Sequence, residues 1–196
     1  MDVLRSVGMA LDSQVFYLAG GTALSLYYGH RRSIDLDWFS IETIDDPMLL
    51  AQQLRDTGVA FQTESISKGT LHGLIQQVRT SFFEYRYPLL QPLIFLEECN
   101  CSLASLDDVA CMKLVAISQR GSKKDFIDIY QLLQHHKPLD QLLDCYQKKY
   151  QTDNILSVLV GMVYYDDADF EPDPPLWSID WQLIKKDLKR IVKQFE

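Results

Sequence analysis

The feature that most constrains the fold is one stretch near the N-terminus, LAGGTALSLYYGHRRSIDLDWF, which covers residues 18–39. Val15–Leu18 has the apolar and aromatic character of a buried strand, and the composition of Thr22–Tyr28 predicts a helix with Thr22 as its N-cap. A strand, a glycine turn and a helix N-terminus make an anion site, because backbone N–H groups and the helix dipole favour a phosphate. Glycine also lets a ligand approach the backbone closely. Since such junctions also occur as plain turns, Gly20, Gly21 and Thr22 alone leave both interpretations open.

The second half of the stretch places two carboxylates on one predicted strand. Asp35 and Asp37 share one face of the expected strand Ile34–Phe39. The other face is apolar and indicates a strand of the core sheet: Ile34, Leu36 and Trp38. Two such carboxylates, about 7 Å apart along a strand, repel each other, and a divalent cation removes that penalty. Asp35 and Asp37 are therefore candidate ligands for Mg²⁺, which favours sparse carboxylate sites completed by water and substrate phosphates; the alternative is a solvated strand face or a set of helix-capping acids.

The rest of the chain divides into a β-rich part and a helical part. After an expected helix at Met48–Asp56, the pattern predicts strands at 61–67, 71–77, 78–87 and 93–96. Beyond Ser102, helical periodicity predicts helices at 109–118, 124–134, 139–150, 154–165 and 181–195, with an acidic, proline-rich loop at 166–175. We therefore predict an α+β protein, with a mixed α/β core in residues 1–100 and a helical region packed on it in residues 101–196.

Together these motifs resemble a known superfamily. Gly20-Gly21-Thr22 followed by Asp35-Leu36-Asp37 is similar to the signature of the DNA polymerase β-like nucleotidyltransferases, and the full wording of residues 18–39 resembles one branch of it, the AbiEii/AbiGii toxin family. The sequence KLVAISQRGSKKDFIDIYQLL, residues 113–133, resembles the second motif of that family. The resemblance implies a polymerase β-like fold in which Asp35 and Asp37 bind Mg²⁺ and Gly20, Gly21 and Thr22 hold the phosphates of an NTP.

By the same resemblance, further residues become candidates for the site. Lys113 would contact the nucleotide phosphates, Arg120 would assist it, and Asp128 would orient Lys113 or activate the acceptor. Ser33 matches a further position of the first motif, where it would either bind phosphate or cap the strand. Asp125 and Asp128 are three residues apart and share a helix face. From spacing alone, two helices linked by weak surface ion pairs are the better explanation of these residues, and the resemblance reverses that order.

The chain departs from the superfamily pattern at one point. Polymerase β-like enzymes usually carry a third carboxylate on a neighbouring strand, which here corresponds to Val78–Tyr87. Ser81 stands where an acid is expected, and Glu84 lies on the opposite face of a regular strand unless a bulge turns it round. The sequence leaves open which of the two takes this place, and with it the strength of two-metal catalysis.

The resemblance implies an enzyme that moves an NMP from an NTP to an acceptor, with Mg²⁺ as cofactor. The implied acceptor is RNA, with the tRNA 3′ end as the first case, and the implied role is that of a toxin encoded with a cognate antitoxin. Two alternatives remain: a nucleotidyltransferase fold that binds nucleotide, RNA or a protein without turnover, and nucleotidylation of a small molecule such as an aminoglycoside.

Composition narrows the classes of protein further. A net charge of −8 disfavours a protein that coats nucleic acid through a broad basic face. The apolar runs are too short to span a membrane. We also expect no secretory signal, because the first residues lack a basic stretch followed by an apolar one. The 4 cysteines lack the paired spacing of a zinc site, so we expect reduced thiols in a cytoplasmic protein without a membrane partner.

Overall fold

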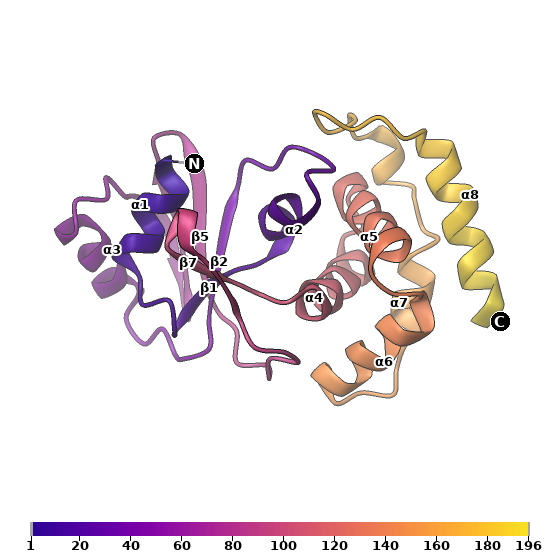
Figure 1. The fold of residues 1–196 in the computed structure, drawn as a ribbon, viewed down its shortest axis with the longest axis horizontal. Helices are drawn as coiled ribbons and strands as arrows, with labels where there is room; N and C mark the ends of the chain where they lie inside the picture. Colours follow the sequence, from indigo (N-terminus) through magenta and orange to yellow (C-terminus); the bar gives the residue numbers. More distant parts are fainter. Residues whose placement is uncertain (1, 196) are drawn as a thin grey trace. The chain divides into compact units, whose positions relative to one another are not determined.

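The strands predicted on either side of the glycine turn form the centre of a mixed sheet (Figure 1). Within residues 2–195, which the computed structural model describes, this sheet has seven strands in the order β3-β4-β5-β2-β1-β7-β6. β1 (Phe16–Leu18) pairs antiparallel with β2 (Leu36–Ser40), which pairs parallel with β5 (Val78–Glu84). β5 ends an antiparallel meander with β3 (Gln62–Ser67) and β4 (Thr70–Ile75), as predicted.

Two elements of the sheet unit, β7 and α1, were not predicted from the sequence. β7 (Cys101–Leu103) pairs parallel with β1 and antiparallel with β6 (Ile94–Leu96), the short strand that was expected. β7 has only three residues, all buried, so it offers no alternation that a sequence pattern could detect. α1 (Asp2–Ala10) contacts β7 and the short 3₁₀ helix η1 (Glu97–Cys99).

One face of the sheet is apolar and packs against a helix. Leu36 and Trp38 of β2 are buried on it, and Phe82 of β5 lies beside Trp38 in register. α3 (Pro47–Asp56) contacts the neighbouring strands β3 and β4. Asp46 is its N-cap and accepts hydrogen bonds from two backbone N–H groups of the first turn, which satisfies donors that a helix start leaves unpaired.

The predicted beginning of the carboxylate strand is wrong. β2 begins at Leu36, so Asp35 precedes it. Ile34, expected on the buried face, is 65% exposed. Thr22 is not an N-cap either, because α2 (Gly20–Tyr28) begins at Gly20, whose positive φ lets the helix start directly at the end of β1.

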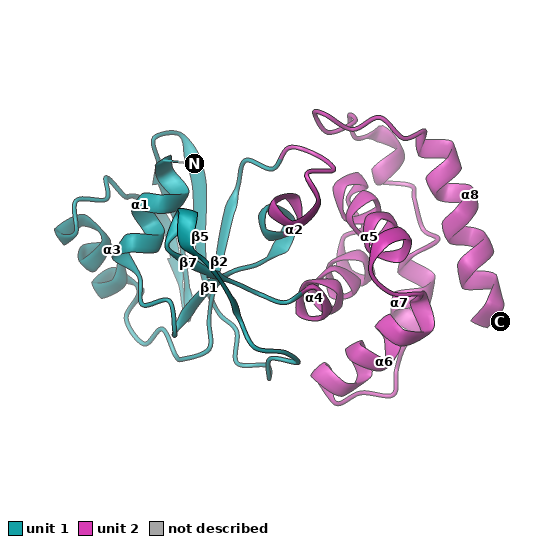
Figure 2. Cartoon of the chain, viewed as in Figure 1, with its two compact units in different colours: residues 1–23, 33–105 teal, residues 24–32, 106–196 magenta. Residues whose placement is uncertain are grey.

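Contact clustering divides the chain into two units (Figure 2). The sheet unit holds the residues up to Ala23 and Ser33–Ser105, and the helical unit holds Leu24–Arg32 and the residues from Leu106 onward. The main division therefore falls after Ser105, while the end of α2 and the following loop group with the helices.

In the helical unit, α4 contacts α5, α6 and α7, and α5 contacts α8. The bounds are α4 (Leu106–Gln119), α5 (Lys123–His135), α6 (Leu139–Tyr150), α7 (Leu156–Gly161), η2 (Ala168–Phe170), α8 (Trp181–Val192) and η3 (Lys193–Phe195). α7 is shorter than predicted, because beyond Gly161 the chain continues in turns such as the one closed by Tyr164 N–H donating to the Gly161 carbonyl. Across residues 2–195, the helices are all too short or too polar to cross a membrane.

Candidate active site

Gly20, Gly21 and Thr22 at the start of α2, here called the glycine corner, meet β2 at the end of β1. Gly20 has a φ of +65°, and a Cβ added to it would lie 3.3 Å from Oδ2 of Asp37. The backbone N–H of Ala19 donates to the carbonyl oxygen of Asp37 at 3.2 Å, which fixes β2 beside the corner. Glycine is therefore required twice, for its backbone conformation and for the closeness of the carboxylate. The Asp37 carboxylate lies directly against the first residue of α2.

Thr22 ties the corner to the segment that precedes β2. Its hydroxyl hydrogen-bonds with the Ser33 hydroxyl at 2.8 Å and with the backbone carbonyl oxygen of Asp35. These contacts hold the backbone of Asp35 against the first turn of α2. The structure thus gathers five predicted site residues in one part of the sheet unit: Gly20, Thr22, Ser33, Asp35 and Asp37.

The register of the sheet identifies the side chain next to Asp37. β2 and β5 pair without interruption from Leu36 with Thr80 to Ser40 with Glu84, so the strand carries no bulge that would turn Glu84 round. Asp37 pairs with Ser81. Glu84 lies on the opposite face, where its Oε2 accepts a hydrogen bond from the backbone N–H of Ile44 at 3.2 Å. Ser81, and not Glu84, is therefore the β5 side chain next to Asp37.

The structure places the Asp37 carboxylate and the backbone of Asp35 at this corner, and both residues stay candidate ligands for a divalent cation. In the part of the chain that the structure describes, no three or more His, Cys, Asp or Glu side chains are grouped closely enough to hold a metal ion by themselves. Mg²⁺ does not need such a group, because it binds through one or two carboxylates and completes its shell with water and substrate phosphates. An aspartate against the positive end of a helix suits a Mg²⁺–phosphate complex.

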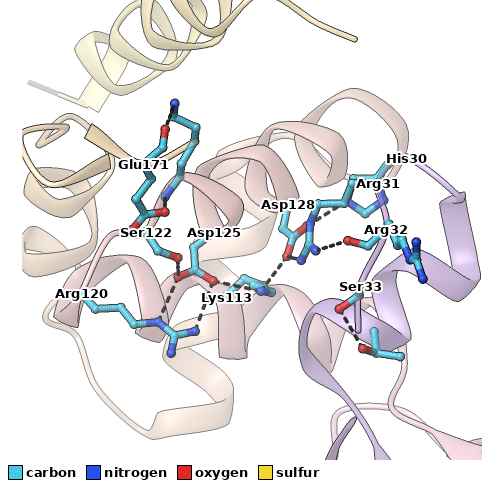
Figure 3. A network of polar contacts seen from close by, with 12 residues as sticks. His30, Arg31, Arg32, Ser33, Lys113, Arg120, Ser122, Asp125, Asp128 and Glu171 are labelled. Carbon is cyan, nitrogen blue, oxygen red and sulfur yellow. Dashed lines mark hydrogen bonds and ion pairs between the residues drawn. The ribbon is translucent and has the colours of Figure 1, made fainter. Parts of the chain in front are cut away.

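The residues of the second motif form another cluster, which lies within the helical unit (Figure 3). Nζ of Lys113 on α4 lies 2.9 Å from Oδ1 of Asp125 and 2.6 Å from Oδ2 of Asp128, both on α5. Nε of Arg120 lies 3.0 Å from the other oxygen of Asp125. The side chains of Lys113, Asp125 and Asp128 are at most 5% exposed, so these are buried ion pairs and not the surface pairs that spacing alone suggested.

Two further members of this cluster, His30 and Arg31, contact Asp128, which the sequence did not predict. Arg31 holds Asp128 through two hydrogen bonds, from Nε and from Nη2, each 2.7 Å long. Nε2 of His30 lies 2.8 Å from Oδ1 of the same carboxylate. A bidentate arginine is the strongest partner that a carboxylate finds among side chains. The signal in the sequence was weak, since 97 residues separate Arg31 from Asp128 and nothing in the spacing connects them.

The cluster keeps Lys113, Asp125 and Asp128 charged at neutral pH. Burial alone would raise the pKa of Asp125, but Lys113 and Arg120 outweigh it and lower that pKa to about 2. Burial likewise opposes ionisation of Asp128, and Lys113, followed by His30 and Arg31, brings its pKa far below the usual range. The pKa of Lys113 is raised, because the two carboxylates overcome the desolvation of its ammonium. The structure thus shows Lys113 in ion pairs with Asp125 and Asp128, and its contact with phosphate stays a prediction.

Comparison with known proteins identifies the family. The family model described as "Nucleotidyl transferase AbiEii toxin, Type IV TA system" matches residues 2–195. The chain belongs to the AbiEii nucleotidyltransferase toxin family. A relative of this family member, an uncharacterized protein of Aquifex aeolicus (strain VF5), is 38% identical over 206 residues, which cover 100% of this chain and 93% of that protein.

Solved structures share the fold of this AbiEii family member. MenT4, a nucleotidyltransferase toxin of Mycobacterium tuberculosis H37Rv, matches with a TM-score of 0.65 at 14% identity, over 99% of this chain and 81% of that one. JHP933 from Helicobacter pylori matches with a TM-score of 0.58 at 16% identity, over 98% of this chain and 88% of that one. At such identities the likeness shows the fold alone, and it confirms the predicted α+β nucleotidyltransferase fold. The family makes the chain an enzyme of nucleotidyl transfer.

Proposed function

We propose that this AbiEii family member transfers an NMP from an NTP to an acceptor hydroxyl, with Mg²⁺ held by Asp35 and Asp37. The observation that carries the proposal is the contact between the glycine corner and the Asp37 carboxylate, with Gly20 φ at +65°. The positive end of the α2 dipole at Gly20, Gly21 and Thr22 favours the phosphates, and the carboxylate beside it favours their metal ion.

To catalyse this reaction, the protein mainly has to align the acceptor with the α-phosphate and neutralise the charge on the phosphate oxygens. The acceptor oxygen bonds to the α-phosphorus while the bond from that phosphorus to the pyrophosphate oxygen breaks, and pyrophosphate leaves. Mg²⁺, when bound, supplies neutralisation of the charge that develops on the phosphate oxygens. Thr22 and Ser33 support the backbone of Asp35 through their hydrogen bonds, which keeps the metal-binding segment in place.

Lys113, Arg120 and Asp128 have supporting roles in the proposal. A cation that stabilises phosphate charge must stay protonated, and two buried carboxylates hold Lys113 in that state. Asp128 orients the Lys113 ammonium at 2.6 Å, and Arg120 shares Asp125 with it.

The proposed acceptor is RNA, with the 3′ end of tRNA as the first substrate to test, and the proposed role is that of a cytoplasmic toxin with a cognate antitoxin. The family description, a toxin of a type IV toxin–antitoxin system, supports the toxin role. MenT4, which shares the fold, is itself a nucleotidyltransferase toxin, and this supports the same role. The tRNA acceptor follows from the resemblance of the two motifs.

The test is transfer of label from each α-³²P-labelled NTP to total RNA, and then to purified tRNA, in the presence of Mg²⁺. We expect labelled RNA and released pyrophosphate with the wild-type protein, and neither with Asp35→Asn or Asp37→Asn. Asp46→Asn is the matched control, because it removes one carboxylate charge from the N-cap of α3, away from the corner. The proposal is overturned if no NTP labels RNA or protein.

A second candidate function, nucleotide binding without turnover, is favoured by one observation. Ser81 stands beside Asp37 in place of an acid, so the site offers fewer carboxylates than a two-metal mechanism uses. Calorimetry that shows Mg²⁺–NTP binding, combined with no transfer to any RNA, would select this candidate; transfer would exclude it.

A further inference from the structure

The sheet face that carries Asp37 carries two more polar side chains in the same row. Asp37 of β2 pairs with Ser81 of β5, and Ser81 pairs with His72 of β4. Residues that are directly paired on neighbouring strands project from the same face of a sheet. Since neighbouring strands lie about 4.8 Å apart, Ser81 is the immediate neighbour of Asp37 in this row and His72 is the next.

His72 and Ser81 are joined by a hydrogen bond. Nδ1 of His72 lies 2.9 Å from Oγ of Ser81. The imidazole stands edge-on to the ring of Phe83, with the ring centroids 5.4 Å apart, which limits its rotation. A serine hydroxyl can donate to an imidazole nitrogen and at the same time accept a hydrogen bond from another hydroxyl group. The pair thus has the arrangement in which a neutral histidine receives a proton through a serine.

We propose that Ser81 and His72 together do the work of the missing third carboxylate, and this inference rests on the proposed nucleotidyl transfer. Ser81 contacts the acceptor hydroxyl and is a catalytic residue, while His72 acts through it as a positioning residue. As the acceptor oxygen bonds to the α-phosphorus, its proton passes to Oγ of Ser81 and the serine proton passes to Nδ1 of His72. The electron pair of the breaking P–O bond leaves with pyrophosphate, and His72 then returns its proton to solvent.

The surroundings of His72 allow it to serve in this way. The residues that face or flank it are Ser65 and the bulge residue Glu64 on β3, and Ser81, Phe83 and Arg79 on β5. Asp37 adds a carboxylate on the far side of Ser81. Imidazole is the side chain whose protonation changes between about pH 5 and 8. A protonated ring would donate to Ser81 and no longer accept from it, so transfer should fall at acid pH.

The experiment compares NMP transfer by the wild-type protein with that of His72→Gln, Ser81→Ala and the double variant His72→Gln/Ser81→Asp. Glutamine can still hydrogen-bond with Ser81 but takes up no proton. We expect kcat to fall by about 10²–10⁴ in His72→Gln, the range of general-base catalysis, with the KM for NTP nearly unchanged. The acid limb of the kcat–pH profile should disappear with it. The double variant places a carboxylate beside Asp37, and its kcat should be at least about tenfold higher than that of His72→Gln.

Ser65→Ala is the matched control, because Ser65 is the exposed partner of His72 on β3. It should keep the wild-type kcat. The inference is overturned if His72→Gln keeps the wild-type kcat and acid limb, or if its loss appears as a raised KM with a lowered melting temperature, which indicates a structural role. If the wild-type protein itself transfers no nucleotide, the proposed function fails and the inference fails with it.

Discussion

Replacing Asp128 by asparagine should destabilise the helical unit strongly. The substitution keeps the shape of the side chain and removes the charge that Lys113, Arg31 and His30 approach at 2.6, 2.7 and 2.8 Å. The Arg31 side chain is only 3% exposed, so water cannot hydrate its guanidinium when the carboxylate is removed. Removing one partner of a buried ion pair costs about 3–5 kcal/mol. For a chain of this length that corresponds to a fall in melting temperature of about 6–20 °C.

Lys113→Met is the comparison that tests whether the loss in Asp128→Asn comes from a buried charge left without a partner. Without the ammonium, Asp125 keeps Arg120 at 3.0 Å and Asp128 keeps Arg31 at 2.7 Å, so each buried carboxylate retains a cation. Methionine also fills most of the volume that the lysine stem occupied. We therefore expect Lys113→Met to lose no more than about 2 kcal/mol of the free energy of unfolding, within the ordinary range for a substitution.

The assay is urea unfolding at pH 7 followed by circular dichroism, with the two single variants and the double variant Asp128→Asn/Arg31→Met. The double variant removes the stranded guanidinium and should regain about 1–2 kcal/mol over Asp128→Asn alone. An Asp128→Asn protein within about 1 kcal/mol of wild type, or a larger loss in Lys113→Met than in Asp128→Asn, would refute the assignment of charges to this cluster.

Three further outcomes can be measured with similar methods. The pKa of Asp125 is about 2 in the folded chain and about 3.9 when unfolded, so its ionisation contributes stability that is complete above about pH 4 and is lost as the pH falls towards 2. Asp125→Asn should therefore make the urea midpoint depend less on pH over that interval. An unchanged pH dependence of the midpoint would contradict this. Gly20→Ala forces a left-handed residue to carry a Cβ 3.3 Å from the Asp37 carboxylate; it should cost about 1–2 kcal/mol and abolish NMP transfer, and a fully active variant would show that the corner is not the phosphate site. Lys149→Met removes the ammonium 2.6 Å from the buried Asp108 carboxylate and should cost about 3–5 kcal/mol, of which added Asp108→Asn should restore a large part; a double variant no more stable than the single one would argue against that pair.

The sequence predicted the parts of the fold whose causes are local. The strand, the glycine turn, the helix and the second strand all lie within residues 16–40, and a positive φ at Gly20 is what a helix starting directly at a strand end requires. The meander of β3, β4 and β5 follows in the same way from alternation and turn residues. These elements could be found because the residues that cause them are neighbours in the chain.

What the sequence could not supply were contacts between distant segments. The pairing of Asp128 with Arg31 joins α5 to the loop after α2, across 97 residues of sequence. The parallel pairing of β7 with β1 depends on three buried residues without a periodic pattern. Thr22 was misassigned for a related reason, since its hydroxyl binds the Asp35 carbonyl and Ser33 and not the N–H groups of its own helix.

The second motif shows why spacing alone favoured the wrong explanation of its charges. Surface ion pairs and buried ones have the same sequence spacing, but they differ in consequence, because a buried carboxylate must keep its cation. In this chain the buried Nζ of Lys113 lies 2.9 Å from Asp125 Oδ1 and 2.6 Å from Asp128 Oδ2. Loss of activity in a variant of Asp128 therefore cannot by itself identify a chemical role, since the same change strands Arg31. Lys113→Met separates the two, because it leaves both carboxylates with a cation; a stable Lys113→Met protein without transfer would place the ammonium in the chemistry.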